Sequence, residues 1–583
     1  MRLRSADPPQ ARIRRRQVAV AAFAVLLTAA DAYVVVLALP DIMAGVGVGL
    51  DELQRATPII SGFLLGYVVA LPLIGRLADL YGRIPTLVCC LGVFALGSLL
   101  TASADGLGLV VAGRALQGVG GGGLVPATLA LVADRWPPER RGVPLGAVGA
   151  AQEVGGVLGP LYGGAILAVT SWRAIFWVNL AGALLLTLAL IGTTGRRPSA
   201  ARGAAGRESA DSAGWATAAT SVGGVLAVGC LVLLLTEPGP LVDSVRLGGV
   251  YVPLVGTAAW SSPLALTTIV LAAGLIAARW RSDGMQRLLR EVDLVGAGLL
   301  GLALAGLILA FAGADPSRQV VADHAGILLG GTALCSALLF WHQRRSTHPL
   351  VPGAAVRPMA AWGALLVNIF VGAALIAALV DVPIYARATR YPDSQLGAAL
   401  VLVEFLVALP VGALLGGWLV HRVAPRAVAA AGMGIAAVGF VGMARWDDRA
   451  LDGPASTVIL VVAGLGFGLA IAPVNAALLA ATRSSVHGVA SALAVVARTV
   501  GMLVGLAVLT AVGLRIFYAE QDRIGSPLTL CPRTPADCPA YNDAIRAALI
   551  SELHAIFVGA ALCAAVAAGL AAALLRSPKG ALD

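Results

Sequence analysis

Residues 150–164 read Ala-Ala-Gln-Glu-Val-Gly-Gly-Val-Leu-Gly-Pro-Leu-Tyr-Gly-Gly, an apolar stretch with one carboxylate, several glycines and a proline. Gly155 and Gly159 lie about one helical turn apart, so a neighbouring helix can approach closely along that side. Pro160 removes a backbone hydrogen bond and bends a helix. Glu153 inside an apolar span costs roughly 2.5–3.5 kcal/mol unless it has a partner. The stretch therefore predicts a deformable helix that carries a proton-sensitive group.

The composition places this helix in a membrane. Hydrophobic residues make up 58% of the 583 residues and charged residues 12%, and the mean hydropathy is +0.88. Apolar runs of about 20 residues, the length needed to cross a bilayer as a helix, recur from end to end. No run shows the alternation of a membrane β-barrel. The fold class predicted from the sequence is an all-α polytopic membrane protein.

The arginines indicate how the chain is threaded through the membrane. The net charge of +10 does not indicate nucleic-acid binding, because the arginines lie in short loops between apolar runs. Residues 1–16 are basic, and the run after them is too long for a signal peptide, so we expect a retained first span. Arginine-rich loops lie at 76–83, 135–141, 196–207, 279–290, 344–357 and 422–426. The pattern predicts a multi-pass protein of the plasma (inner) membrane with both termini cytoplasmic.

The apolar runs divide the chain into three parts. The first six cover 18–40, 57–75, 85–103, 107–133, 142–168 and 174–195. Four follow at 216–236, 262–280, 292–313 and 325–341, and six more at 360–386, 396–420, 427–444, 456–481, 488–515 and 547–575. This gives sixteen spans, or fourteen if 216–280 is only half inserted. We expect an N-terminal six-helix half at 1–197, a linker with additional transmembrane helices at 198–358 and a C-terminal six-helix half at 359–583.

An internal repeat links the two halves. Adding 346 to the numbers of Gly118, Gly120, Gly122, Gly142, Gly155 and Gly159 gives Gly464, Gly466, Gly468, Gly488, Gly501 and Gly505. Two parallel halves with a substrate path at their interface are a transporter architecture. The repeat therefore predicts a transporter.

Four motifs resemble those of the major facilitator superfamily. Gly75-x-Leu-Ala-Asp79-x-x-Gly82-Arg83 resembles its signature loop, and Arg114-Ala-Leu-Gln117-Gly118 resembles its second motif. Gly155-x-x-x-Gly159-Pro160-x-x-Gly163-Gly164 is similar to the motif of its antiporters, and Asp31-Ala-Tyr33 to the first-helix motif of its 14-spanner drug:proton antiporters. The resemblance implies two six-helix halves with two to four extra linker helices.

Further residues resemble those of the mycobacterial triacylglyceride and lipoglycan exporters of this family, namely Asp41-Ile-Met, Gln152-Glu153 and Val-Ala-Arg498-Thr-Val-Gly501. That resemblance implies a lipid substrate and an extracytoplasmic lipoprotein partner. The family also implies that the signature loop latches the cytoplasmic face in the outward-open state. Leu80 and Ile84 depart from the family pattern, because they replace two basic residues of the loop.

Buried charges are the candidates for proton coupling. Asp31 lies in the middle of an apolar run, and we expect it to be the main proton carrier. The alternative is a structural hydrogen bond to Tyr67 or to a backbone carbonyl. Arg114 needs an anion within its span, for which Asp31 is a candidate, unless its guanidinium snorkels to the outer interface.

Glu153 is the second candidate proton carrier. The repeat offset places Gln152 opposite Arg498, so Glu153 can meet Arg498 across a central cavity. We hypothesise that this pair closes the cavity and opens when Glu153 is protonated or substrate enters. Asp381 is a further acid, near the outer end of its span, where we expect it to be interfacial.

The loops offer a latch and a disulfide. Asp79 and Arg83 are four residues apart and can pair on a helix; the alternative is a solvated loop that only sets the topology. In the second half His421 takes the place of the aspartate. Cys531 and Cys538 lie in a loop that the topology puts outside, where a disulfide is favoured. Residues 514–520 and 544–554 look helical, so the last two spans are expected to project beyond the membrane.

No enzyme signature is present. Gly118 to Gly123 lie within an apolar run and follow no strand, which indicates helix packing rather than a nucleotide loop. Lys579 is the only lysine, so a phosphate-binding loop is excluded. We expect no metal and no cofactor, with the proton gradient as energy source. The sequence thus predicts a proton-coupled antiporter that exports hydrophobic or amphiphilic molecules, lipids or drugs, by alternating access. The alternative is a proton-independent facilitator or lipid flippase of the same fold.

Overall fold

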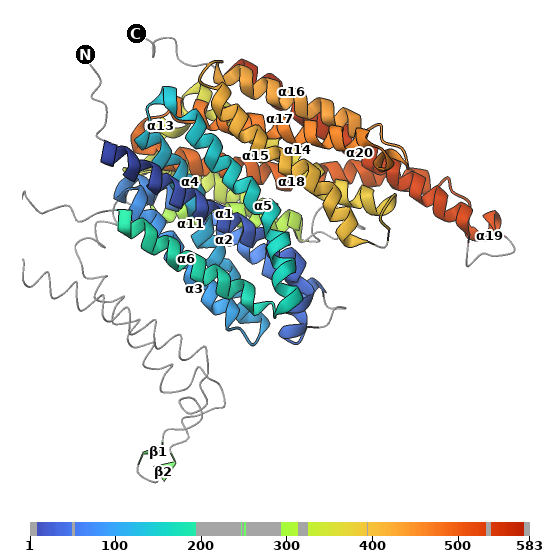
Figure 1. The fold of residues 1–583 in the computed structure, drawn as a ribbon, viewed down its shortest axis with the longest axis horizontal. Coiled ribbons are helices and arrows are strands. Elements are labelled where there is room, and N and C mark those ends of the chain that lie inside the picture. The colour runs from blue at the N-terminus through green and yellow to red at the C-terminus, as the bar shows by residue number, and fades with distance from the viewer. Residues whose placement is uncertain are drawn as a thin grey trace, which may run out of the picture.

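The computed structural model describes residues 8–48, 53–193, 293–312, 324–392, 394–531 and 538–575. It also describes two short strands, β1 (Arg246–Leu247) and β2 (Val250–Tyr251), which pair antiparallel. The expected spans at 216–236 and 262–280 lie outside the described residues. The part of the chain that is described is otherwise built from helices (Figure 1).

Within the described residues, fourteen long helices follow the predicted spans. The first half holds α1 (Pro8–Gly45), α2 (Leu53–Tyr81), α3 (Arg83–Ala102), α4 (Leu107–Arg135), α5 (Gly142–Val169) and α6 (Arg173–Thr193). The linker holds α11 (Leu294–Ala312) and α12 (Ala325–Arg345). The second half holds α14 (Met359–Ala388), α15 (Gln395–Leu419), α16 (Pro425–Met443), α17 (Pro454–Ala481), α18 (His487–Gln521) and α20 (Pro539–Leu574). Short turns of helix join them: η2 (Pro138–Arg140), α13 (Gly353–Val356), η4 (Ala450–Asp452), η5 (Ser484–Val486) and α19 (Pro527–Leu530).

Among the described helices, twelve are long and apolar enough to cross a membrane. Their outer surface carries large apolar side chains, such as Leu185 and Leu188 of α6 at 67% and 66% exposed and Ile327 of α12 at 76% exposed. Water would disfavour such a surface, whereas lipid tails solvate it. The prediction of an all-α polytopic membrane protein is confirmed. The domain boundaries at 197/198 and 358/359 stay a prediction.

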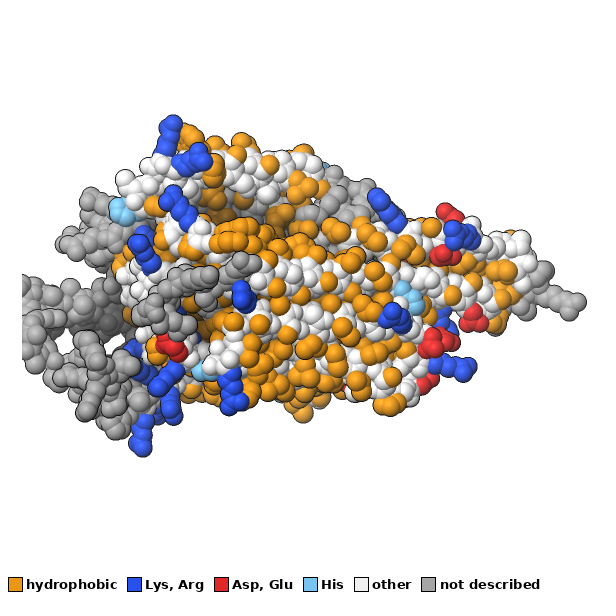
Figure 2. All heavy atoms as spheres, turned by 90° about the horizontal axis from the view of Figure 1, so that it is seen from above, with side chains coloured by type: hydrophobic (Ala, Val, Ile, Leu, Met, Phe, Trp, Pro, Cys, Tyr) orange, Lys and Arg blue, Asp and Glu red, His pale blue; other side chains and the backbone are white. Residues whose placement is uncertain are grey.

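The surface also distinguishes the two ends of the bundle. Figure 2 shows a broad band of hydrophobic side chains, with Lys and Arg gathered at one end and Asp and Glu mixed with them at the other. The first of these, the arginine-rich end, holds the α2–α3, α4–α5 and α15–α16 connections. The start of α1 and the end of α20 lie at this same end (Figure 1).

Equivalent glycines make equivalent helix contacts in the two halves. A Cβ at Gly118 would collide with the carbonyl oxygen of Phe63 in α2, and a Cβ at Gly464 with that of Phe405 in α15. Gly155 likewise meets the backbone of α1 at Leu26, as its counterpart Gly501 meets α14 at Ile369. Lipid supplies no hydrophobic force between helices, so close backbone approach at small residues drives their packing. The glycines that repeat at an offset of 346 residues therefore make the same kind of helix contact in both halves.

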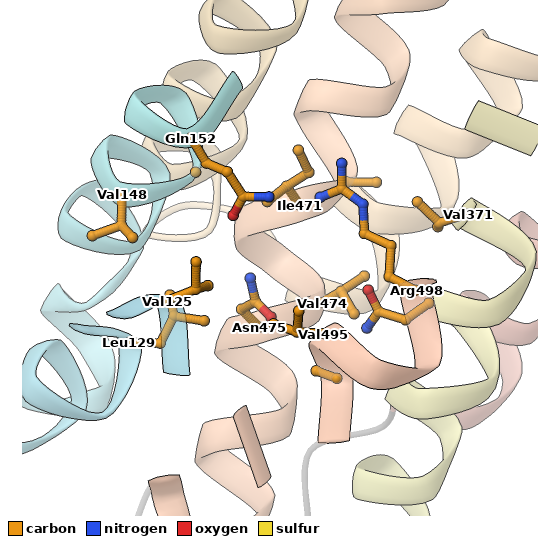
Figure 3. A pocket seen from close by; sticks show the side chains of 14 residues that line it. Val125, Leu129, Val148, Gln152, Val371, Ile471, Val474, Asn475, Val495 and Arg498 are labelled. Atoms are coloured by element: carbon orange, nitrogen blue, oxygen red, sulfur yellow. The ribbon is translucent and has the colours of Figure 1, made fainter. Parts of the chain in front are cut away.

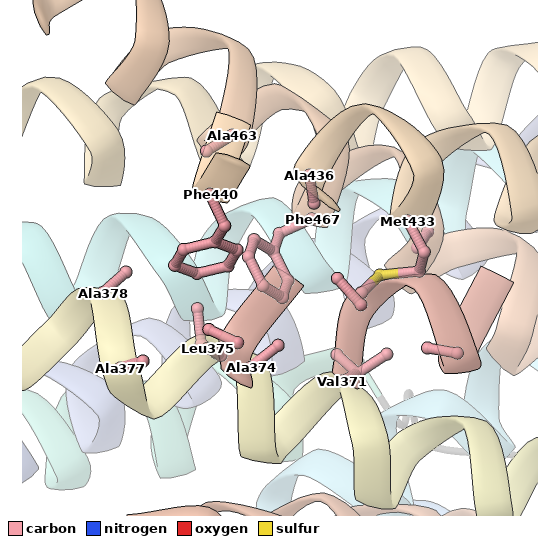
Figure 4. Packing of buried hydrophobic residues seen from close by; sticks show 14 of the residues in the cluster. Val371, Ala374, Leu375, Ala377, Ala378, Met433, Ala436, Phe440, Ala463 and Phe467 are labelled. Carbon is pink, nitrogen blue, oxygen red and sulfur yellow. The ribbon is translucent and has the colours of Figure 1, made fainter. Parts of the chain in front are cut away.

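Aromatic rings pack between alanine-rich helices of the second half. Figure 4 shows Phe440 of α16 and Phe467 of α17 side by side between α14 and its neighbours. Their ring centroids are 5.8 Å apart, with an edge-to-face angle of 86°. This geometry is favourable for aromatic pairs. Aromatic side chains therefore contribute to the core of the second half.

The repeated glycine contacts give a first prediction. We expect Gly464→Ala and Gly118→Ala to lower the free energy of unfolding by about 1–3 kcal/mol, because the added methyl group must push two helices apart. Gly434→Ala in α16 is the control, because a Cβ there has open space within 4 Å. The measurement is the thermal midpoint of the purified variants. Equal midpoints for all three variants would contradict the packing scheme.

Candidate functional site

Asp31 lies at the centre of a buried polar network in the first half. The carboxylate is 0% exposed. It accepts hydrogen bonds from Arg114 Nη1 at 2.6 Å and from Asn179 Nδ2 at 2.6 Å. Gln117 Nε2 approaches it at 3.4 Å and also donates to Ser98 Oγ at 2.9 Å. The network ties α1, α3, α4 and α6 together inside one half.

Arg114 is paired within the membrane, so the snorkelling alternative is wrong. Its guanidinium is 1% exposed, and its carbon lies 4.3 Å from the centre of the Phe63 ring. Asp31 accepts its hydrogen bonds from Arg114 and Asn179 rather than from Tyr67, the alternative partner. A buried pair of this kind is held by geometry and by additional hydrogen bonds, because desolvation of both charges is costly.

A second buried ion pair joins the two halves. Arg498 Nη2 of α18 lies 3.0 Å from Glu153 Oε1 of α5. The side chains are 17% and 11% exposed, so this pair is slightly more open than the Asp31–Arg114 pair. The contact hypothesised from the repeat offset is therefore present. Because its two charges come from different halves, separating the halves breaks it.

A pocket lies beside this ion pair, between the halves (Figure 3). Gln152 of α5 and Arg498 of α18 point into it from opposite walls. Its lining comes from α4, α5, α14, α17 and α18 and is mostly aliphatic: Val125, Leu129, Val148, Val371, Ala470, Ile471, Val474, Ala494 and Val495, with Gly149, Asn368 and Asn475. The cavity between the halves has a volume of about 50 Å³ in this closed arrangement. An apolar lining with a few polar groups suits a hydrophobic ligand.

The arginine-rich end is closed by contacts between the halves. Asp79 at the end of α2 accepts hydrogen bonds from the backbone amides of Gly488 at 2.8 Å and Val489 at 3.0 Å. These amides belong to the first turn of α18, where helix amides lack partners and the helix dipole favours a negative charge. The carboxylate thus caps a helix of the other half.

Arg83 holds this cap in place. Its Nη1 lies 2.5 Å from Asp79 Oδ1, its Nε lies 3.0 Å from Asp134 Oδ2, and its Nη2 donates to the carbonyl of Ser484 at 3.0 Å. In the sequence between Asp79 and Arg83, Gly82 adopts a φ of +93°, which lies in the left-handed region that favours glycine. The signature loop is therefore a structured contact with the other half, and the solvated-loop alternative is wrong.

Two glycine pairs bring the halves into backbone contact at the same end. Gly75 of α2 faces Gly488 of α18, and Gly142 of α5 faces Gly417 of α15. A Cβ at any of the four would meet the opposite carbonyl oxygen. At the second pair, His421 stands where the first pair has Asp79, and its ring contacts the carbonyl of Gly417 in its own turn at 3.1 Å. The two contacts that close this end, Gly75–Gly488 beside Asp79 and Gly142–Gly417 beside His421, therefore differ in their neighbouring side chain.

The expected disulfide and helical extension are both present. Cys531 and Cys538 are bonded. Helix α18 runs to Gln521 and α20 begins at Pro539, so both continue past the predicted spans. Figure 1 shows this pair of helices, with α19 near its tip, projecting from the end opposite the arginines.

The structure adds residues that the sequence did not single out. Asp381 is packed against other helices, at 4% exposed, and lies near Glu552 of α20; its place at the membrane interface stays a prediction. The sequence analysis did not single out Asn179, Asn368 or Asn475. The available signal was the same in each case, a lone asparagine within an apolar run. Of the antiporter motif, Gly155, Gly159 and Gly163 face α1, which explains why small residues are needed there.

The sequence profile of the Major Facilitator Superfamily matches residues 21–315. A triacylglyceride transporter of Mycolicibacterium hassiacum is 36% identical over 529 residues, which are 88% of this chain and 82% of the relative. The chain belongs to the major facilitator superfamily. Another relative, a triacylglyceride transporter of Mycobacterium tuberculosis, is 35% identical over 86% of this chain and 83% of its own.

Solved structures of the superfamily share the fold. A human organic anion transporter gives a TM-score of 0.53 at 15% identity and covers 96% of this chain and 99% of its own. A proton:xylose symporter gives a TM-score of 0.53 at 12% identity and covers 98% of this chain and 97% of its own. This major facilitator protein is thus a multi-pass membrane transporter rather than an enzyme.

The Asp31 network gives a second prediction. We expect Asp31→Asn to destabilise the protein by about 3–5 kcal/mol, because it leaves the Arg114 guanidinium buried without a countercharge. The double variant Asp31→Leu/Arg114→Leu should be less destabilised than Asp31→Asn, because neither charge remains. The measurement is the thermal midpoint in detergent.

The control for this prediction is Asp105→Asn. Asp105 is 80% exposed and lies 3.6 Å from Arg173. Exposed pairs contribute about 0–1 kcal/mol, so the midpoint should barely change. A double variant no more stable than Asp31→Asn would contradict the pairing argument.

Proposed function

We propose that this protein is a proton-coupled antiporter that exports lipids resembling triacylglycerides by alternating access. The observation that carries the proposal is the apolar pocket between the halves, bordered by one ion pair, Glu153–Arg498, that spans them. Support for the substrate class comes from the relatives in Mycolicibacterium and Mycobacterium named triacylglyceride transporters.

The pocket lining suits acyl chains. Branched aliphatic residues supply most of its surface, and Gln152, Asn368 and Asn475 offer hydrogen bonds to ester carbonyls. A strongly charged substrate would find one cation, Arg498, which is already paired with Glu153. Hydrophobic drugs share the apolar chemistry and form a second substrate class for the same pocket.

Two carboxylates are proposed to carry the proton. When Glu153 is protonated, the pair with Arg498 loses its Coulomb attraction, and the contact between the halves weakens. When Asp31 is protonated, Arg114 is released, so α1 can shift against α4 within the first half. Proton binding is thereby linked to helix movement. The driving force is ample, because one charge crossing 100 mV yields roughly 2.3 kcal/mol.

The orientation follows from charge. We place the arginine-rich end and both termini in the cytoplasm of a cell whose plasma membrane holds the protein, because basic loops stay inside. The disulfide at the opposite end then lies in the oxidising compartment. With this orientation, Asp79 and the two glycine pairs close the cytoplasmic side, and the latch stabilises the outward-facing state.

The projecting ends of α18 and α20 are proposed to receive the lipid or to meet an extracytoplasmic lipoprotein. A water-insoluble substrate needs a partner or a surface once it leaves the membrane. The disulfide between Cys531 and Cys538 ties the connection between these two helices.

The second candidate is a proton-independent facilitator or lipid flippase. It is favoured by the scarcity of ionisable groups in the pocket, where Arg498 is the charged side chain among the lining residues. In that case Glu153 and Asp31 have structural roles, and lipid movement follows its own gradient.

Proteoliposome transport separates these functions. We expect a proton gradient to accelerate movement of a labelled triacylglyceride roughly ten-fold or more. The free energy that corresponds to a ten-fold change is smaller than the roughly 2.3 kcal/mol that one charge releases on crossing 100 mV. Glu153→Gln should abolish that acceleration and keep counterflow, because the halves still move without proton control. The control is Asp105→Asn in the exposed pair with Arg173, where both rates should stay unchanged.

Three outcomes would overturn parts of the proposal. An unchanged rate with and without the gradient would establish the facilitator. Transport of a labelled cationic dye without the triacylglyceride would replace the lipid substrate by a drug. A full gradient response in Glu153→Gln and in Asp31→Asn would remove both carboxylates from the coupling.

A further inference from the structure

A second hollow opens at the arginine-rich end, away from the central pocket. It has a volume of about 810 Å³ and is open to the surroundings. The start of α1, the α4–α5 connection, the start of α5 and the turn after α15 line it. It contains neither Glu153 nor Arg498, so it is not the central pocket.

The hollow is basic at its rim and apolar below. Arg14 and Arg15 of α1 and Arg135 and Arg140 of the α4–α5 connection supply the charge. Apolar residues continue inward along the same helices: Val18, Ala19 and Ala22 on α1, and Val143, Pro144 and Ala147 on α5. At a rise of 1.5 Å per residue, the apolar stretch on α1 reaches about 10 Å beyond the arginines.

The rim charge is not neutralised by the described part of the protein. None of the four rim arginines lies within ion-pair distance of a carboxylate among the described residues. The acid next to them in sequence, Glu139, is exposed and does not line the hollow. Asp134 is paired with Arg83 instead. A ligand for this place therefore carries negative charge at one end and hydrocarbon at the other.

We propose that this hollow, which we call the basic groove, binds an anionic phospholipid from the leaflet at the arginine-rich end. The phosphate lies among Arg14, Arg15, Arg135 and Arg140, and the acyl chains lie along α1 and α5. Basic pockets between transmembrane helices are suited to phospholipid headgroups. Arginine is well matched to phosphate, because its planar fork can donate two hydrogen bonds at once.

The bound lipid would touch both halves. His421 belongs to the second half and completes a lining otherwise made by the first. It follows the α15 segment whose Gly417 contacts Gly142 of α5. When the halves separate at this end, the groove loses His421. The lipid therefore stabilises the state closed at the arginine-rich end, a regulatory role separate from that of the transported substrate.

The test titrates purified protein with phosphatidylglycerol and with phosphatidylcholine and follows the thermal midpoint and the lipid retained in native mass spectrometry. We expect phosphatidylglycerol to be retained and to raise the midpoint. Removing one groove pair, Arg14→Gln/Arg15→Gln or Arg135→Gln/Arg140→Gln, should weaken its binding roughly twenty-five-fold, at about five-fold for each arginine. The Arg→Lys versions keep the charge and should keep most of the binding.

Two further variants distinguish the groove from general surface charge. Arg422→Gln/Arg426→Gln removes the same charge at the same end, outside the groove, and should leave binding unchanged. Ala147→Phe fills the apolar part and should abolish retention with all four arginines intact. Thermal midpoints in phosphatidylcholine alone verify that each variant folds.

Several results would overturn the proposal. Equal weakening by the groove pairs and the Arg422/Arg426 pair would indicate only surface electrostatics. Equal retention of phosphatidylglycerol and phosphatidylcholine would remove the role of the charge. Stabilisation by glycerol phosphate as strong as that by phosphatidylglycerol would show that a headgroup alone suffices.

Discussion

A guanidinium inside a membrane needs an anion, and this constraint organises the protein. Arg114 and Arg498 both lie within apolar helices, and each meets one carboxylate from another helix. The Asp31–Arg114 pair lies wholly in the first half, where Asn179 and Gln117 also contact the carboxylate. The Glu153–Arg498 pair spans the halves and has fewer partners. The first pair links helices of one half, whereas the second depends on how the two halves meet.

Backbone packing follows the same division. Within each half, glycines let helices touch along much of their length, and the equivalent glycines of both halves repeat these contacts. Between the halves, backbone contact at glycine pairs occurs at the arginine-rich end, where Gly75 meets Gly488 and Gly142 meets Gly417. Separation of the halves must therefore break these backbone contacts together with the Asp79 cap and the Glu153–Arg498 pair. A small change in charge at Glu153 or Asp79 is well placed to shift their arrangement, because each contacts the opposite half.

The sequence predicted much of this because membrane spans, glycine repeats and buried charges leave strong signals. Span positions followed from hydropathy, and the partners of Arg114 and Arg498 followed from the cost of an unpaired charge. Contacts that depend on helix rotation were out of reach. Helix packing, rather than composition, decides which face of a helix carries Asn368 or Asn475. It also decides whether Asp381 is buried. The cap that Asp79 places on α18 required the positions of two chain segments about 400 residues apart.

We propose that the Glu153–Arg498 pair holds the halves together in the state closed at the arginine-rich end. Spin labels at Glu139 in η2 and Arg426 in α16, both exposed and in different halves, report the separation of this end by pulsed electron paramagnetic resonance. In lipid nanodiscs we expect Glu153→Gln to add a population at longer distance, while Glu520→Gln retains the distribution of the unaltered protein. Identical distributions for Glu153→Gln and the unaltered protein would contradict the account.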